Sequence, residues 1–199
     1  MMVKFFVESK HDNTVETVFL QTLLCVLGIS KNRYKIEHVN GRDNLKNMEN
    51  VFIDNSLNGG KNFIIFDADR TEDGAGYQLT EKRIYSTFMD KSVIDGIFLF
   101  PNNHDDGILE NLLEHLMQKD KHKRFLDCFS DYEHCLGDDY VSPDLKGKLH
   151  TYMSAQKDLS NTKRNKLGSG QWLFDDKRFW NLDVDYILPL KNFLSDCFG

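Results

Sequence analysis

Apolar residues in the first part of the chain fall into short runs separated by segments of mixed polarity. The runs cover Val3–Val7, 34–39, 63–66 and 94–101, and turn residues bound each of them. The run at 63–66 is entirely apolar, which is typical of a strand buried on both faces of a parallel sheet. The run at 34–39 alternates, as a half-buried strand does. The pattern therefore predicts four strands.

The segments between these runs carry apolar side chains at helical spacing. They cover 15–26, 45–53, 77–89 and 108–116, and Gly28 ends the first of them. Strand and helix thus alternate four times, which indicates parallel strands joined by crossover helices. We expect an α/β fold, a Rossmann-like parallel sheet of about four strands with helices on both faces.

The alternation stops after about residue 118, and the rest of the chain reads as helical. The ranges 124–136 and 143–157 have helical spacing, whereas 158–170 is polar and basic and predicts a mobile loop. A last helix is expected over 184–198, beginning near Pro189 or kinked there. The sequence therefore predicts an α/β domain over 1–118 and a helical C-terminal extension over 119–199 packed on it.

The composition is that of an ordinary globular protein, with 40% apolar and 28% charged residues among 199. A net charge of −6 argues against a surface broadly coated for nucleic acid, although it permits a local basic patch. No apolar run approaches the roughly 20 residues of a membrane helix. The first apolar stretch stops at Glu8, too early for a signal peptide. We therefore expect a cytoplasmic protein with no membrane contact.

None of the four cysteines, Cys25, Cys128, Cys135 and Cys197, belongs to a Cys-x-x-Cys pair. Buried free thiols in a reducing compartment are the expected interpretation. A zinc site built from Cys128, Cys135, His122 and His134 is an alternative, although the spacing matches no common zinc module.

Acidic residues follow several of the predicted strands. Asp67 and Asp69 come directly after the third strand, and Glu8 comes after the first. Parallel strands end at the same edge of a sheet, where open α/β sheets bind their ligands. Asp12, four residues after Glu8, and Glu110, in the helix after the fourth strand, are expected at the same edge.

Carboxylates gathered in this way repel one another unless a cation lies between them or one takes a proton. Carboxylate oxygens suit hard cations such as Mg²⁺ or Mn²⁺. The sequence therefore predicts a divalent-metal site at this edge. The alternative is that the acids cap helix N-termini, where negative charge is favourable.

The order of these acids resembles the Toprim domain, the metal-binding module of topoisomerases, primases and OLD-type nucleases. Toprim sequences have a glutamate after the first strand and Asp-x-Asp after a later one, and OLD-type members have a second acid four residues after the glutamate. The matching segments are Val-Glu-Ser-Lys-His-Asp at 7–12 and Phe-Ile-Ile-Phe-Asp-Ala-Asp at 63–69. The closest similarity is to a bacterial Toprim-like family of unknown function, through Pro101-Asn102 and the Gly-Ile-Leu-Glu at 107–110.

The resemblance covers residues 3–118 and implies a Toprim-like fold with one-metal or two-metal phosphodiester chemistry. It implies these metal ligands, one of which could instead be a general base: Glu8, Asp12, Asp67, Asp69 and Glu110. Catalytic roles fall on Glu8, Asp67, Asp69 and Lys10, with Lys10 offsetting phosphate charge unless it is simply solvated. Many Toprim sequences have glycine where Ser9 stands, and a serine leaves less room for close approach of a phosphate.

Two basic clusters could hold a nucleic-acid backbone next to such a site. They contain Lys121, Lys123 and Arg124, and then Lys163, Arg164 and Lys166. A solvated helix start and a solvated loop would give the same pattern.

A histidine and a group of aromatic residues each have a functional and a purely structural interpretation. His104 is a candidate base or metal ligand, or else a surface histidine. Four aromatic residues are expected to pack the extension onto the sheet, since base stacking would need exposed rings; they are Trp172, Phe174, Phe179 and Trp180.

Three functions fit the sequence. The first is a Toprim-like, Mg²⁺-dependent nuclease or related phosphotransfer enzyme acting on nucleic acid, in a bacterial defence or mobile-element system. The second is a metal-binding or nucleotide-binding regulatory module without turnover. The third is a Toprim-derived interaction protein whose acidic edge no longer binds metal.

Overall fold

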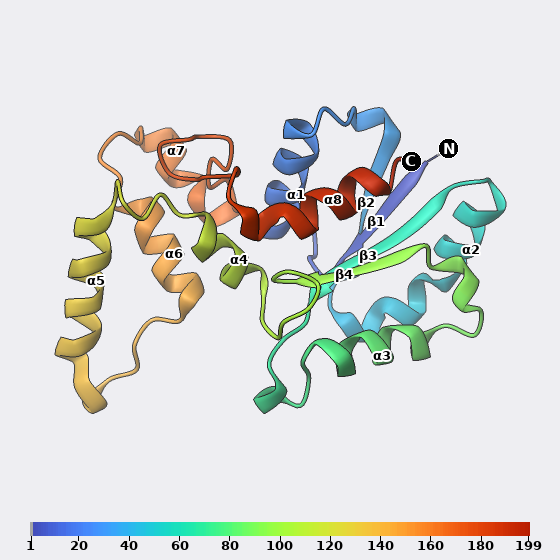
Figure 1. Ribbon diagram of the computed structural model, residues 1–199, viewed down its shortest axis with the longest axis horizontal. Coiled ribbons are helices and arrows are strands. Elements are labelled where there is room, and N and C mark those ends of the chain that lie inside the picture. Colours follow the sequence, from blue (N-terminus) through green and yellow to red (C-terminus); the bar gives the residue numbers. More distant parts are fainter. Residues whose placement is uncertain (1) are drawn as a thin grey trace.

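The computed structural model describes residues 2–199 and contains a four-stranded sheet in which all neighbouring strands are parallel. The strands β1 (Val3–Val7), β2 (Tyr34–His38), β3 (Lys61–Asp67) and β4 (Gly96–Phe100) lie in the order β2-β1-β3-β4. The predicted α/β fold is confirmed (Figure 1). Because β1 and β3 are parallel neighbours, with Val7 opposite Ile65, their carboxyl ends lie at one edge.

One face of the sheet is covered by α2 (Glu49–Leu57) and α3 (Tyr77–Thr87) (Figure 1). Alternate strand residues point to this face. The ring of Phe6 from β1 stacks on that of Phe52 from α2, with centroids 3.6 Å apart. Full burial of a phenylalanine side chain contributes about 1.5–3 kcal/mol to stability, so such pairs hold the layer in place.

The opposite face is covered by two helices from distant parts of the chain, α1 (Val15–Val26) and α8 (Leu188–Asp196) (Figure 1). Phe193 of α8 packs against Phe63 of β3 and Phe98 of β4, at centroid distances of 5.6 and 5.4 Å. The last helix therefore supplies part of the core of the sheet rather than a separate appendage.

Between β4 and α8 the chain forms four α-helices, α4 (Leu109–Leu116), α5 (Lys123–Leu136), α6 (Leu145–Ser154) and α7 (Asn161–Asn165). The four aromatic residues expected to pack the extension onto the sheet are buried, and they share one hydrophobic cluster with the strand residues Phe5 and Phe63. Trp180 Nε1 donates to the carbonyl of Trp172 at 2.8 Å, and Phe174 packs edge-on against Phe19 of α1. Rings enclosed in this way cannot stack on bases.

Several boundaries differ from those expected. The predicted loop over 158–170 contains α7, because Ser160 caps its first turn and the buried Leu167 anchors the turn that follows. The predicted helix over 45–53 begins as a 3-10 helix at Arg42–Met48 and becomes α-helical only in α2. The last α-helix starts at Leu188, with Pro189 in its first turn. Proline is tolerated there because backbone N–H groups in the first turn have no hydrogen-bond partner within the helix.

The cysteines differ from expectation in burial. All four are free, but only Cys197 is buried, while Cys25, Cys128 and Cys135 are exposed. Within residues 2–199 no group of three His, Cys, Asp or Glu side chains is placed to hold a metal ion, so the alternative zinc site is not formed. Across the same residues, no helix combines the length and apolarity needed to cross a bilayer.

Candidate functional site

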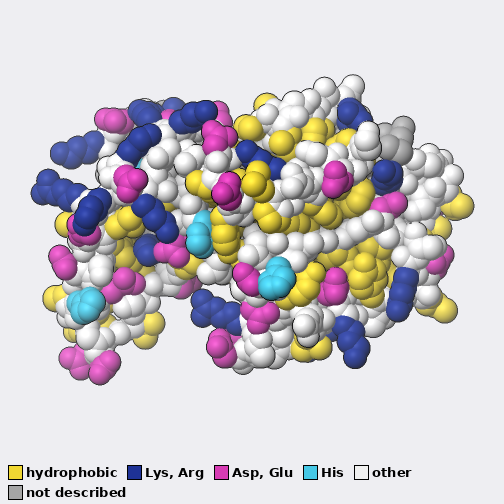
Figure 2. All heavy atoms as spheres, in the orientation of Figure 1, with side chains coloured by type: hydrophobic (Ala, Val, Ile, Leu, Met, Phe, Trp, Pro, Cys, Tyr) yellow, Lys and Arg dark blue, Asp and Glu magenta, His cyan; other side chains and the backbone are white. Residues whose placement is uncertain are grey.

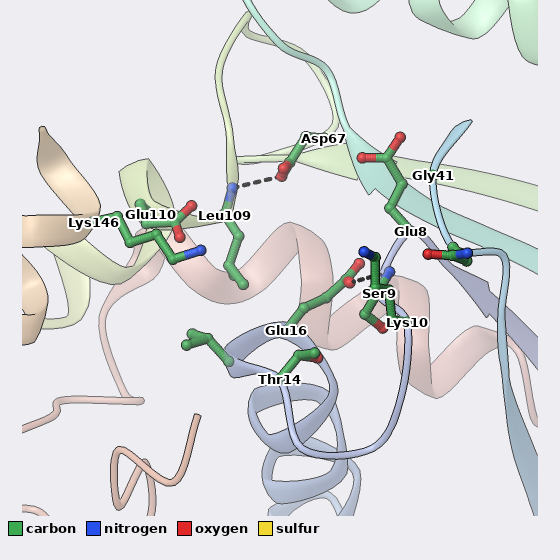
Figure 3. Close-up of a pocket in the computed structure, with 12 residues that line it drawn as sticks. Glu8, Ser9, Lys10, Thr14, Glu16, Gly41, Asp67, Leu109, Glu110 and Lys146 are labelled. Atoms are coloured by element: carbon green, nitrogen blue, oxygen red, sulfur yellow. Dashed lines mark hydrogen bonds between the residues drawn. The ribbon is translucent and has the colours of Figure 1, made fainter. Parts of the chain in front are cut away.

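The carboxyl edge of the sheet contains a cavity of about 430 Å³, which we call the acidic cavity. Four carboxylates line it, each from a different element: Glu8 after β1, Glu16 in α1, Asp67 at the end of β3 and Glu110 in the first turn of α4 (Figure 3). Lys10 and Lys146 also line it. Parallel strands and the helices that follow them thus bring together groups more than 100 residues apart in sequence.

Asp67 is the most constrained of these acids. Its Oδ1 accepts a hydrogen bond from the backbone N–H of Leu109 at 2.7 Å (Figure 3). Burial raises the pKa of Asp67 well above its usual value, and the nearby charges of Glu16 and Glu110 raise it further. The folded protein therefore holds Asp67 in a place where a nearby positive charge or a proton is favoured.

Glu16 belongs to the acidic cavity although the sequence analysis missed it. Thr14 caps α1 by accepting from the backbone N–H of Thr17 at 3.3 Å, so Glu16 lies in the first helical turn. Its Oε2 accepts from the backbone N–H of Ser9 at 3.1 Å (Figure 3). Burial raises the pKa of Glu16 to about 7, with a further contribution from the charge of Glu8.

Asp12 lies outside the acidic cavity. It was expected at the same edge as Glu8, but α1 begins only at Val15, so Asp12 lies in the preceding loop. Its carboxylate is 73% exposed and contacts His38 Nε2 at 3.1 Å. His104 is likewise a surface residue, 87% exposed and paired with Asp105. Neither residue lines the acidic cavity.

Arg42 is a second residue that the sequence analysis missed. Its Nε donates to Glu8 Oε1 at 3.1 Å, and its Nη2 donates to Asp69 Oδ2. One guanidinium thus neutralises two of the predicted metal ligands. Burial raises the pKa of Glu8, and Arg42 opposes that rise. The signal in the sequence was weak, because Arg42 opens a 3-10 helix that has no distinctive residue pattern.

Asp69 lies beside the acidic cavity rather than in it. Reciprocal backbone hydrogen bonds of 2.8 Å join Asp69 to Gly107, which fixes the loop after β3 against the loop after β4. A second cavity, of about 450 Å³, contains Asp69 together with Asp67 and Glu110. Asp67, Glu110 and Lys146 line both spaces.

Comparison with known proteins identifies the family. A family model described as "Protein of unknown function (DUF3226)" matches residues 2–199. The chain belongs to the DUF3226 family. Comparisons with curated proteins and with solved structures find no match. The assignment of a function to this DUF3226 protein must therefore be argued from its site.

The donor chemistry of the DUF3226 site fits an oxygen-binding divalent cation. Glu8, Glu16, Asp67 and Glu110 offer only carboxylate oxygens to the acidic cavity, and burial raises the pKa of each. Within residues 2–199, however, no three acids are placed to hold one metal ion together. Arg42 holds the carboxylate of Glu8 toward Asp69. Binding an ion would therefore require side-chain movement, with Glu8 released from Arg42.

The basic clusters singled out in the sequence lie away from these cavities. Lys and Arg side chains gather at the end of the molecule that contains α5 to α7 (Figure 2). Several are already engaged: Lys123 pairs with Asp127 at 2.7 Å, and Arg164 donates to the carbonyls of Ser154 and Gln156. The cations next to the acidic cavity are instead Lys10, Lys146 and Arg42.

Proposed function

We propose that this DUF3226 protein cleaves a phosphodiester bond of nucleic acid with the help of Mg²⁺ or Mn²⁺. The observation that carries the proposal is the acidic cavity, in which four carboxylates from four elements meet two lysines. An anionic substrate would be repelled by carboxylates alone, so the arrangement makes chemical sense when cations reverse the local charge. The resemblance of the acid pattern to Toprim nucleases supports the same reaction.

The position of each residue in the acidic cavity suggests its role in this reaction. Asp67 and Glu110 would hold the ion, with Glu8 as a further oxygen donor. The ion, when bound, supplies stabilisation of the developing negative charge and lowers the pKa of water. Lys10 and Lys146 line the same space and would neutralise the non-bridging phosphate oxygens.

Glu16 is suited to accept a proton from the attacking water. A general base works best when its pKa lies near the working pH. Burial raises the pKa of Glu16 to about 7, and its Oε2 remains oriented by the backbone N–H of Ser9. Lys10, from the loop between Ser9 and α1, would then face the leaving group from the same side of the cavity.

The test is cleavage of supercoiled DNA, single-stranded DNA and structured RNA in Mn²⁺ and Mg²⁺. Asp67→Asn should lower turnover by several orders of magnitude, because it removes a charge from the centre of the cavity. Asp12→Asn is the matched control, since Asp12 is an acid of the same edge that lies outside the cavity. Equal cleavage by wild type and Asp67→Asn would indicate a contaminating nuclease and contradict the proposal.

A second candidate is a cytoplasmic module that binds a metal or a nucleotide without turnover. The pairing of Arg42 with both Glu8 and Asp69 favours it, because the guanidinium already occupies the position of a cation between them. A rise in melting temperature with Mg²⁺ in the absence of any cleavage would support this module. Absence of both effects would leave the interaction-protein hypothesis.

A further inference from the structure

Glu8 also lines a third hollow, distinct from the acidic cavity. It has a volume of about 1020 Å³ and lies between the 3-10 helix Arg42–Met48 and α3. Three of its lining residues are cationic, Arg42, Lys46 and Arg83, and we call it the basic groove. Nothing in the sequence pattern had marked these residues, which are spread over 42 positions.

Two of the three cations are available to a ligand. Lys46 and Arg83 are exposed, and neither has a carboxylate within ion-pair distance in the part of the chain that the structure describes. Asp43 is the one acid of the groove besides Glu8 among residues 2–199. Two unpaired cations in a protein of net charge −6 favour an anionic ligand at this place.

The basic groove and the acidic cavity meet at Glu8, which lines both. Arg42 stands at the same junction, with its guanidinium bonded to Glu8. An extended polyanion lying along Lys46 and Arg83 would therefore lead directly to the carboxylates of the acidic cavity. The distal basic clusters do not line either space.

We propose that the basic groove binds the phosphodiester backbone that flanks the bond placed at the acidic cavity, through Lys46 and Arg83 with Arg42 at the junction. The inference rests on the proposed function for the identity of the polymer. The contacts are made to phosphates, so they position the strand and carry no base specificity. The ligand chemistry is a chain of phosphodiesters rather than a single nucleotide, because the two exposed cations come from different elements along an open groove.

The experiment measures binding without cleavage, by fluorescence anisotropy of a labelled oligonucleotide in EDTA and in Ca²⁺ over a series of NaCl concentrations. The double variant Lys46→Glu/Arg83→Glu is compared with Lys31→Glu/Lys82→Glu, which changes the net charge equally. Lys31 also lies in a 3-10 helix and Lys82 also lies on α3, and both are exposed outside the groove. Melting temperatures show whether each variant is folded.

We expect the groove variant to lose at least about tenfold in affinity and its log–log salt slope to shrink by about 1.4–1.8, as two lost phosphate contacts predict. The control should bind like the wild type. Equal losses in both variants, or no loss in the groove variant, would overturn the proposal. So would a loss confined to a third variant, Lys163→Glu/Lys166→Glu, which would move the backbone to the distal cluster. Competition by ATP without binding of the oligonucleotide would also overturn it.

The two proposals can fail separately. Binding that depends on Lys46 and Arg83 without cleavage in any metal would retain the groove and reject the nuclease. Cleavage by wild type with unchanged binding and unchanged KM in the groove variant would retain the nuclease and reject the groove.

Discussion

Asp67 Oδ1 accepts a hydrogen bond from the backbone N–H of Leu109 at 2.7 Å, which joins the end of β3 to the first residue of α4. The bond fixes the carboxylate in the acidic cavity and leaves its charge close to Glu16 and Glu110. The fold thus fixes the position of the Asp67 carboxylate and also brings it close to other negative charges. Each effect can be tested by substitution.

Asp67→Asn should stabilise the metal-free protein. The amide keeps an acceptor for Leu109 N–H and removes a charge that burial disfavours, so we expect a gain of about 1–3 kcal/mol in the free energy of unfolding at about pH 8. The raised pKa means that the gain should shrink as the pH falls and wild-type Asp67 takes up a proton. Urea unfolding in EDTA at about pH 8 and at a lower pH measures the difference in free energy of unfolding between variant and wild type. Lower stability of the variant at about pH 8 would contradict the burial argument.

Glu16→Gln should change how stability depends on pH. The pKa of Glu16 is raised from 4.5 to about 7, so between these values the folded state binds more protons than the unfolded state. The wild type should therefore lose stability as the pH rises from about 4.5 to 7, by up to about 3 kcal/mol. The variant should lack this loss. Exposed Glu72→Gln is the control, and parallel pH profiles for wild type and Glu16→Gln would reject the assignment.

Arg42→Met should lower stability in EDTA by about 1–3 kcal/mol, because Glu8 and Asp69 then face each other without a cation. Mg²⁺ should restore part of the loss. Lys148→Met is the matched control, because Lys148 forms an ion pair of 2.6 Å with Glu114. The two ion pairs are buried to the same degree: the side chains of Lys148 and Glu114 are 24% and 31% exposed. Those of Arg42, Glu8 and Asp69 are 23%, 24% and 32% exposed. Thermal melts with and without Mg²⁺ compare them. Equal responses of both variants to Mg²⁺ would mean that the ion acts elsewhere.

Gly170→Ala should destabilise the protein strongly. Gly170 has φ +74°, and a Cβ there would lie 2.3 Å from the carbonyl carbon of Thr14, which belongs to the backbone at the start of α1. The backbone must shift to make room, so we expect a loss of more than about 2 kcal/mol. Gly168→Ala meets no atom within 4 Å and should be near neutral. Melting temperatures of the two variants measure this difference in stability. Similar values would show that α1 can move freely.

The strands and the shared edge of Glu8 and Asp67 could be predicted, because runs of apolar residues report burial and parallel strands end together. Asp12 was predicted at the site and Glu16 was missed, because which acid enters the cavity depends on where Thr14 starts α1. Arg42 could not be predicted, since its partners lie 34 residues before it and 27 after it and no periodicity records such a contact. Local patterns predict elements, whereas side-chain pairing between loops depends on the finished fold.

The position of α8 against β3 and β4 constrains how this protein can be synthesised. Phe193 packs on Phe98 and Phe63, which are synthesised about 95 and about 130 residues earlier, a delay of roughly 5–26 s at ordinary translation rates of about 5–20 residues per second. During that interval the sheet face lacks the part of its cover that α8 supplies, and Phe63 and Phe98 remain open to chaperones or to other nascent chains. A stalled chain ending before residue 188 should therefore remain bound to a chaperone that the longer chain releases.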